Sequence, residues 1–215
     1  MGNGGSMRKG SGRVLGGLCL FLSNYVFIAV ALGARPLCTD DAGVVEKGKY
    51  ELETGYDITS DEQIGNISFK HGITDRMDIG ISLPLQVKPL EEDIFCPSGI
   101  GMKFMLVKDM VSFSFTNELG TSDYIINGIF SKELSFISVH FNLGYEYTGI
   151  SGEKGEISYS GAFEFPVKKV DIVGEILNEE GILFGGRIHI KDCIALDTGY
   201  NIKNKLLTVG LHYEF

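Results

Sequence analysis

Apolar and polar residues alternate with a period of two from about position 49 to the end of the chain. In the last eleven residues, 205–215, aliphatic and aromatic residues take every second position, and small or polar residues fill the positions between them. Successive side chains of a β-strand point to opposite faces, so each such segment predicts a strand with one apolar and one polar face. The predicted strands are 49–58, 63–71, 77–87, 99–107, 111–119, 124–131, 135–148, 155–166, 170–177, 182–190, 194–202 and 205–215.

Alternation alone does not separate a soluble β-sandwich from a membrane barrel, because both have one apolar face per strand. Three further features favour the barrel. The number of predicted strands is even, which lets an antiparallel meander close on itself and leave no edge in lipid. Every second connection is tight, whereas 88–98 and 149–154 are longer. Most segments approach the roughly 9 to 11 residues that a tilted membrane strand needs. We therefore expect an all-β, antiparallel up-and-down transmembrane β-barrel of about 12 strands.

The N-terminal residues have the pattern of an export signal. Arg8, Lys9 and Arg13 precede an apolar run over 14–32, which ends at the small pair Gly33 and Ala34. This order of basic, apolar and small residues is typical of a cleaved secretory signal peptide. An uncleaved membrane anchor is the alternative, since the run is just long enough to span a bilayer. The predicted organisation is a signal peptide at 1–34, a short periplasmic segment at 35–48 with no plug, and the barrel at 49–215.

The C-terminal strand ends on an aromatic residue, with apolar residues at alternate positions before it. Leu211, Tyr213 and Phe215 resemble the signal by which outer-membrane barrels are recognised for assembly. The resemblance implies two partners, the barrel-assembly machinery and outer-membrane lipid, and it places the protein in a bacterial outer membrane.

Charge excludes one class of partner and suggests what lines the barrel. Asp and Glu number 28 against 19 Lys and Arg, with a pI near 4.9, so we expect no nucleic-acid partner. The polar faces carry far more carboxylates than cations, which predicts a cation-preferring or neutral-solute pore. The alternative is that the acids pack around the few cations and plug the barrel. The predicted lining residues are Glu51, Glu53, Asp57, Asp78, Lys103, Glu118, His140, Glu146, Glu164, Glu175, Arg187, His189 and Asp197.

Candidate chemistry adds little to this interpretation. Ser138, His140 and Asn142 share one polar face, and outer-membrane phospholipases use these residue types. Such an enzyme must present its nucleophile to lipid, whereas this trio lies opposite the apolar face. We expect Arg187 to compensate Glu175 and Asp197 rather than to bind a solute. We expect no catalytic residues, no metal site and no cofactor, and leave open a bond between Cys38 and Cys193.

Two motifs resemble a known family. The run from Arg35 to Glu53, with Thr39-Asp40-Asp41-Ala42-Gly43 and Lys47-Gly48-Lys49-Tyr50, is similar to the mature N-terminus of the putative transporters of the meta-pathway of phenol degradation. The run from His71 to Gly80 resembles that family's first periplasmic hairpin. Cys38 departs from the pattern, which has an aliphatic residue there. The resemblance implies an outer-membrane barrel.

Together these patterns predict a passive outer-membrane channel for small solutes. No nucleotide-binding loop accompanies the barrel, so the channel would be passive and not an enzyme. The alternatives are a closed barrel with a structural or surface-binding role and, more remotely, a phospholipase-like enzyme. The sequence does not identify the solute.

Overall fold

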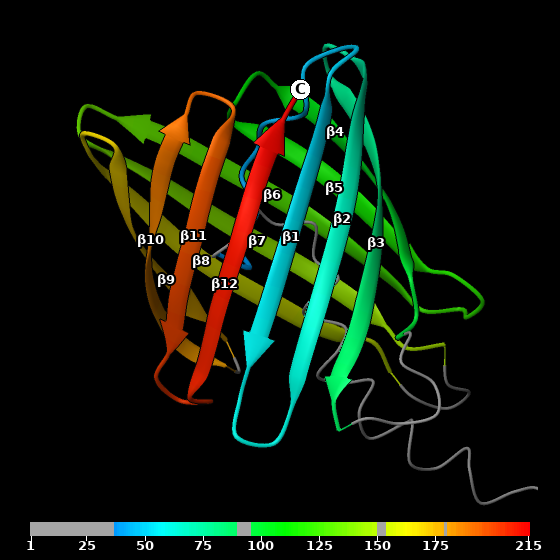
Figure 1. The fold of residues 1–215 in the computed structure, drawn as a ribbon. Helices are drawn as coiled ribbons and strands as arrows, with labels where there is room; N and C mark the ends of the chain where they lie inside the picture. Colours follow the sequence, from blue (N-terminus) through cyan, green and yellow to red (C-terminus); the bar gives the residue numbers. More distant parts are fainter. Residues whose placement is uncertain (1–36, 90–95, 150–153, 179) are drawn as a thin grey trace, which may run out of the picture.

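The computed structural model describes residues 37–89, 96–149, 154–178 and 180–215, and within them the chain forms one closed antiparallel barrel (Figure 1). Each strand pairs with the next one in sequence, and β1 pairs with β12 to close the ring. The predicted all-β fold and its 12 strands are confirmed. The predicted signal peptide lies outside the described residues. The strands are β1 (Tyr50–Ile58), β2 (Gln63–Thr74), β3 (Met77–Lys88), β4 (Gly99–Val107), β5 (Val111–Glu118), β6 (Tyr124–Leu134), β7 (Ile137–Tyr147), β8 (Glu156–Val167), β9 (Val170–Leu177), β10 (Gly181–Lys191), β11 (Ile194–Asn201) and β12 (Leu206–Glu214).

The outer face of the barrel is apolar around its whole circumference. Large apolar side chains project outward from every strand, as Ile79, Ile81 and Leu83 do from β3. Leu143 on β7 and Leu196 on β11 continue this surface on other sides of the barrel. Such a continuous apolar surface is poorly solvated by water and is compatible with the hydrocarbon of a membrane. The described residues include no helix long and apolar enough to cross a membrane.

The tight connections lie at one end of the barrel, together with the C-terminus (Figure 1). Two residues separate β2 from β3, β6 from β7, β8 from β9, and β10 from β11, and three residues separate β4 from β5. In two of these turns the backbone enters the left-handed region, with φ of 52° at Asp109 and 62° at Lys168. The alternation of tight and longer connections is therefore present in the fold.

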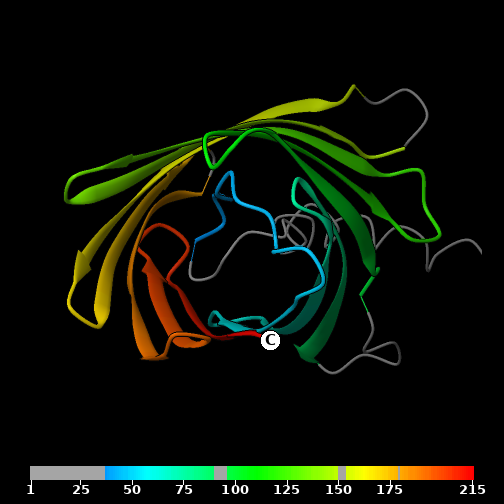
Figure 2. The same ribbon diagram turned by 90° about the horizontal axis from the view of Figure 1, so that it is seen from above.

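The residues before β1 do not stay outside the barrel. Residues 37–46, which we call the inner segment, run inside the ring of strands (Figure 2). Leu37 and Ala42 are only 3% and 0% exposed, and Val45 is also buried. This part of the predicted periplasmic segment at 35–48 therefore lies within the lumen. The inner segment carries no strand period, so its sequence pattern did not indicate where it lies.

Gly72 lets the chain pass from the lumen into β1. The backbone N–H of Gly48 donates to the Gly72 carbonyl oxygen at 2.8 Å, and the Gly72 N–H donates to the Lys49 carbonyl oxygen at 3.1 Å. A β-carbon on Gly72 would lie 2.1 Å from the carbonyl oxygen of Glu46 and 2.4 Å from that of Val45. No side chain fits there. The two sequence motifs, within 35–53 and 71–80, therefore touch at this glycine.

We expect Gly72→Ala to destabilise the protein, because the added methyl group must push the backbone at Val45 and Glu46 away from β2. Overpacking of this kind costs about 1–3 kcal/mol. Thermal unfolding of the detergent-solubilised protein measures the change. Gly128→Ala is the matched control, since a β-carbon there would meet its nearest neighbouring atom at 3.8 Å. Equal stability of the two variants would contradict the close approach at Gly72.

Candidate functional site: the barrel lumen

The strand register defines which residues face the lumen. Residues paired across antiparallel strands point to the same side of the sheet. Pairs such as Glu53 with His212, Asp78 with Lys103, and Arg187 with Asp197 can be followed around the closed ring. The register puts every predicted lining residue on this inner face, and the list comprises Glu51, Glu53, Asp57, Asp78, Lys103, Glu118, His140, Glu146, Glu164, Glu175, Arg187, His189 and Asp197. Their role in lining a pore stays a prediction.

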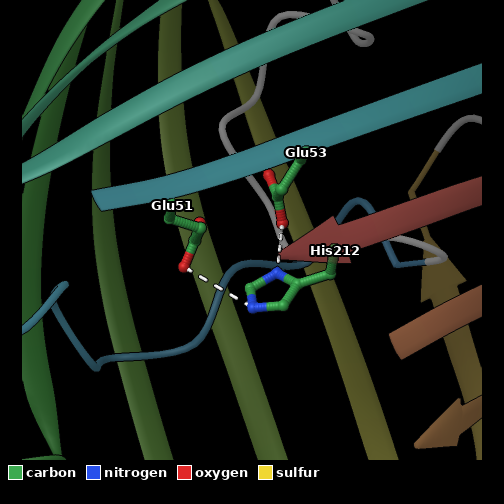
Figure 3. Close-up of side chains that lie close together, drawn as sticks. All are labelled: Glu51, Glu53 and His212. Carbon is green, nitrogen blue, oxygen red and sulfur yellow. Dashed lines mark hydrogen bonds and ion pairs between the residues drawn. The ribbon is translucent and has the colours of Figure 1, made fainter. Parts of the chain in front are cut away.

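One inner cluster joins β1, β2 and β12 (Figure 3). The ammonium of Lys70 lies 2.6 Å from Glu51 Oε1 and 3.3 Å from Glu53 Oε2. His212 approaches the same carboxylates, with Nδ1 3.4 Å from Glu53 and Nε2 4.0 Å from Glu51. The hydroxyl of Ser68 donates to Glu53. Sequence spacing could not reveal this cluster, because His212 reaches β1 only through barrel closure.

The spacing of this cluster resembles that of a metal site, but the Lys70 ammonium already lies between its carboxylates. Single ligand atoms of Glu51, Glu53 and His212 all lie within 4.8 Å of one another. A divalent cation there would have to compete with the Lys70 ammonium, which is bound to both carboxylates. The geometry is therefore that of an ion-pair network across the β1–β12 closure.

A second cluster joins β8 to β11. Arg187 Nε donates to Asp197 Oδ1 at 2.8 Å, and Arg187 Nη1 lies 3.7 Å from Glu164. The expected pairing of Arg187 with Asp197 is present, whereas Glu164 takes the place expected for Glu175. Nearby, His189 Nε2 lies 2.6 Å from Asp171 Oδ2. Buried guanidinium groups need such partners, because leaving one unpaired in the lumen wall is costly.

Glu175 instead holds the start of the inner segment. Its carboxylate accepts hydrogen bonds from the backbone N–H of Cys38, at 3.1 Å, and from the N–H and hydroxyl of Thr39. Leu37 packs beside these contacts against Ala162, Val173 and Leu183. A carboxylate bound by several donors is well satisfied without a cation, which explains why Glu175 has no need of Arg187.

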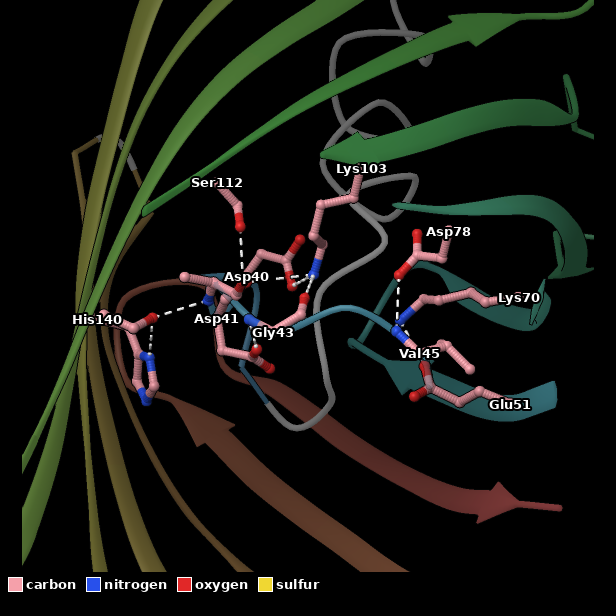
Figure 4. Close-up of polar contacts among 12 residues, drawn as sticks. Asp40, Asp41, Gly43, Val45, Glu51, Lys70, Asp78, Lys103, Ser112 and His140 are labelled. Carbon is pink, nitrogen blue, oxygen red and sulfur yellow. Dashed lines mark hydrogen bonds and ion pairs between the residues drawn. The ribbon is translucent and has the colours of Figure 1, made fainter. Parts of the chain in front are cut away.

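Lys103 binds the middle of the inner segment (Figure 4). Its buried ammonium lies 2.8 Å from Asp40 Oδ1 and donates to the carbonyl oxygens of Asp41 and Gly43 at 3.2 and 3.0 Å. Asn142 on β7 also fits this part of the segment. With its amide oriented to satisfy both ends, it donates to the Asp40 carbonyl and accepts from the Asp40 N–H. Sequence reasoning missed Asp40 and Asp41 as lumenal residues.

Further wall residues bind the backbone of the inner segment. Ala42 N–H donates to Ser131 Oγ at 2.8 Å, and Ser112 Oγ donates to the Ala42 carbonyl oxygen at 2.5 Å. Val45 N–H donates to Asp78 Oδ2 at 3.0 Å. The inner segment is therefore held by side chains from six strands, β3, β4, β5, β6, β7 and β9.

The residues considered for phospholipase-like chemistry do not form a catalytic relay. Ser138, His140 and Asn142 all face the lumen, on the side away from the apolar surface. His140 Nδ1 is hydrogen-bonded to Ser131 Oγ at 2.9 Å, and Asn142 contacts Asp40. Asn142 thus binds the inner segment directly, and His140 does so through Ser131, rather than serving a nucleophile at the lipid surface. No disulfide joins Cys38 to Cys193, so the bond left open between them is not formed.

The C-terminal residues complete the barrel. Phe215 N–H donates to the Tyr50 carbonyl oxygen at 2.9 Å, and Tyr50 N–H donates back to the Phe215 carbonyl oxygen at 2.8 Å. Leu211 shares the outer side of β12 with Tyr213, and the rings of Tyr213 and Phe215 stack at 5.0 Å. The role of these three residues as an assembly signal stays a prediction.

Comparison with solved structures identifies the class of fold. The chain is similar to the KdgM porin, with a TM-score of 0.57 and 11% identity over 77% of this chain and 99% of that one. It is also similar to the NanC porin, with a TM-score of 0.54 and 8% identity over 76% and 98% of the two chains. The fold is therefore that of the small 12-stranded outer-membrane porins. No family model and no curated protein matches the sequence.

The Asp40 carboxyl gives the seated inner segment a pH dependence. Burial, together with the neighbouring charge of Asp41, raises the pKa of Asp40 from 3.8 to about 6, against the opposing effects of Lys103 and Lys70. A group whose pKa is raised in the folded state takes up a proton more readily there. Proton uptake by Asp40 therefore stabilises the folded protein. This stabilisation is complete below about pH 4 and is lost as the pH rises through about 6.

We therefore expect the thermal midpoint of the wild-type protein to rise more between pH 7.5 and pH 5 than that of Asp40→Asn, which cannot titrate at this position. Both proteins share every other titrating group, so the difference between their two slopes reports Asp40. Thermal unfolding in one detergent and buffer series measures it. Parallel slopes would show that Asp40 has an ordinary pKa.

Proposed function

We propose that the protein is a passive channel for small solutes in a bacterial outer membrane, without enzymatic activity. The closed ring and its apolar outer surface support insertion in lipid. The shared fold of the KdgM and NanC porins supports a channel. The partners in this proposal are outer-membrane lipid, the barrel-assembly machinery through β12, and a solute that the structure does not identify. One solved KdgM structure is described as a complex with disordered oligogalacturonate, which is a property of that protein.

The excess of carboxylates on the inner face carries the proposal that cations pass preferentially. Nine of the thirteen predicted lining residues are Asp or Glu, and the inner face sets Lys70, Lys103 and Arg187 against them. Each of these cations is already paired with a carboxylate. A lumen with a surplus of negative charge raises the local concentration of cations and repels anions.

Kinship with the putative transporters of the meta-pathway of phenol degradation is a finer proposal. It is supported by the contact between its two motifs at Gly72, where the N-terminal run crosses the first tight hairpin. Such a contact would explain why this chain and that family have both motifs, because the residues of one motif limit which residues fit in the other.

A closed barrel with a structural or surface-binding role is the second candidate. The inner segment favours it, because residues 37–46 occupy part of the lumen. Conductance in planar bilayers separates the two candidates, since a closed barrel passes no current.

We expect the wild-type channel to prefer K⁺ over Cl⁻, and the double variant Asp57→Asn/Glu146→Gln to prefer K⁺ less strongly. A unit charge about 10 Å from an ion in water contributes roughly 0.4 kcal/mol, or about a two-fold change in local concentration per charge. The reversal potential across a KCl gradient measures the permeability ratio. Asp61→Asn is the control, because Asp61 is exposed in the β1–β2 connection. An unchanged ratio in the double variant would remove these carboxylates from the ion path.

We also expect the purified protein to require detergent and to migrate differently on gels before and after boiling, because a closed barrel resists unfolding by dodecyl sulfate at room temperature.

Replacing two outward residues, as in Leu143→Glu/Leu196→Glu, should abolish membrane insertion, whereas the inward change Ser158→Glu should not. Urea-resistant association with liposomes measures insertion. A monodisperse wild-type protein in detergent-free buffer would contradict the membrane assignment.

A further inference from the structure

We propose that the inner segment is a built-in plug, fastened to the β3–β9 wall by Lys103 and Glu175, that restricts flow through the barrel. The proposal rests on the channel function proposed above and adds a residue-level control of conductance. It concerns the barrel with the inner segment bound inside the lumen.

The first support is an apolar patch on the inner face that the inner segment covers. Val173 and Leu183 point into the lumen and are 0% and 1% exposed. They are covered by Leu37, with Ala162 at the side. Without the inner segment these side chains would face the water of the lumen, which is unfavourable for groups of this size. The wall is therefore matched to an occupant that carries an apolar residue at this point.

The second support is the way in which the wall satisfies the backbone of the inner segment. An irregular chain in a lumen exposes N–H and carbonyl groups that need partners. The wall supplies them along the segment. Glu175 accepts from the N–H groups of Cys38 and Thr39, Ser131 and Ser112 bind the N–H and the carbonyl oxygen of Ala42, and Asp78 accepts from the N–H of Val45. A chain that merely rested in the lumen would not meet a matched donor or acceptor at each of these residues.

The third support is the Lys103 ammonium, which acts as a central anchor. It binds one side-chain oxygen and two backbone oxygens of the inner segment, at Asp40, Asp41 and Gly43. Lys103 and Asp40 are both buried. Removing the segment would leave the Lys103 charge facing only its own wall, where Asp78 is the neighbouring carboxylate. The ion pair therefore favours the seated segment.

The polar contacts of the inner segment gather on one part of the wall, so we place the route for flow beside the opposite part. Among the described residues, the polar side chains that bind the inner segment come from β3 to β9. Inner glycines pair on both walls, but Gly80 and Gly101 lie on the wall that the segment contacts, whereas β10, β11, β12 and β1 carry theirs on the other wall. Gly185 pairs with Gly199, and Gly55 pairs with Gly210. Inner positions without side chains leave room along this wall. Flow in the plugged state would therefore follow the β10–β1 side.

The test compares single-channel conductance of the wild type, Lys103→Met, and a variant lacking residues 37–46. We expect both variants to conduct about two-fold more than the wild type, because the inner segment contacts about half of the wall and pore width sets current. Lys108→Met is the matched control, since Lys108 is exposed in the β4–β5 turn. It should conduct like the wild type.

A second measurement reports the anchor without relying on current. Cys38 lies in the inner segment, so the labelling rate of its thiol by a charged maleimide reports how firmly the segment is seated. In a Cys19→Ser/Cys96→Ser/Cys193→Ser background, which leaves Cys38 as the one thiol, we expect Lys103→Met to label several-fold faster than Lys108→Met. Equal labelling rates would overturn the anchoring role of Lys103.

The outcomes distinguish the plug from the channel. Equal, non-zero conductance in the wild type and in the deletion variant would overturn the plug and leave the channel in place. Absence of current in every protein, including the deletion variant, would overturn the channel and with it the plug's control of flow. A deletion variant with a higher single-channel conductance than the wild type supports both the channel and the plug.

Discussion

The pairing of β1 with β12 is the interaction on which the rest of the structure depends. A β-sheet with a free edge exposes unpaired N–H and carbonyl groups, which a hydrocarbon environment does not tolerate. Here the first and last strands pair over eight residues, from Glu51 with Glu214 to Ile58 with Leu207, and Tyr50 and Phe215 extend the pairing at its end. Closure gives the sheet an inside and an outside. It therefore turns a simple alternation of apolar and polar residues into a lipid-facing surface and an enclosed polar lumen.

Enclosure changes what the polar residues must do. On an open sheet, Glu53 or Asp197 would be solvated, but on the inner face both are buried and need partners. The few cations meet this need, because Lys70 bridges two carboxylates of β1 and Arg187 lies between Glu164 and Asp197. Glu175 and Asp78 are satisfied differently, by backbone N–H groups of the inner segment. The inner segment thus completes the hydrogen bonding of a wall that has too few cations for its acids.

The sequence predicted the strands and their facing well, because both depend on local periodicity. The outward position of Ile79 and the inward position of Asp78 follow from the period of two alone. The partners of inner residues could not be predicted, since register and closure bring Glu53 to His212 across 159 positions. The inner segment was missed for the same reason. Its residues have no period, and Thr39 and Asp40 find their partners 136 and 63 positions away. Gly72 was the available signal, because a glycine at the end of a long strand can mark the close approach of another backbone.

The inner segment also bears on selectivity, because it engages Lys103, the one lysine on the inner face of β3 to β7 among the residues described. With Lys103 bound to Asp40 and to two carbonyl oxygens, its positive charge is compensated locally. An ion passing along the opposite wall would then experience the remaining carboxylates more than Lys103, since paired charges largely cancel at a distance. Narrowing the lumen strengthens this effect, because a thinner water layer screens the wall less. The same segment that restricts flow would therefore favour cations in the flow that remains.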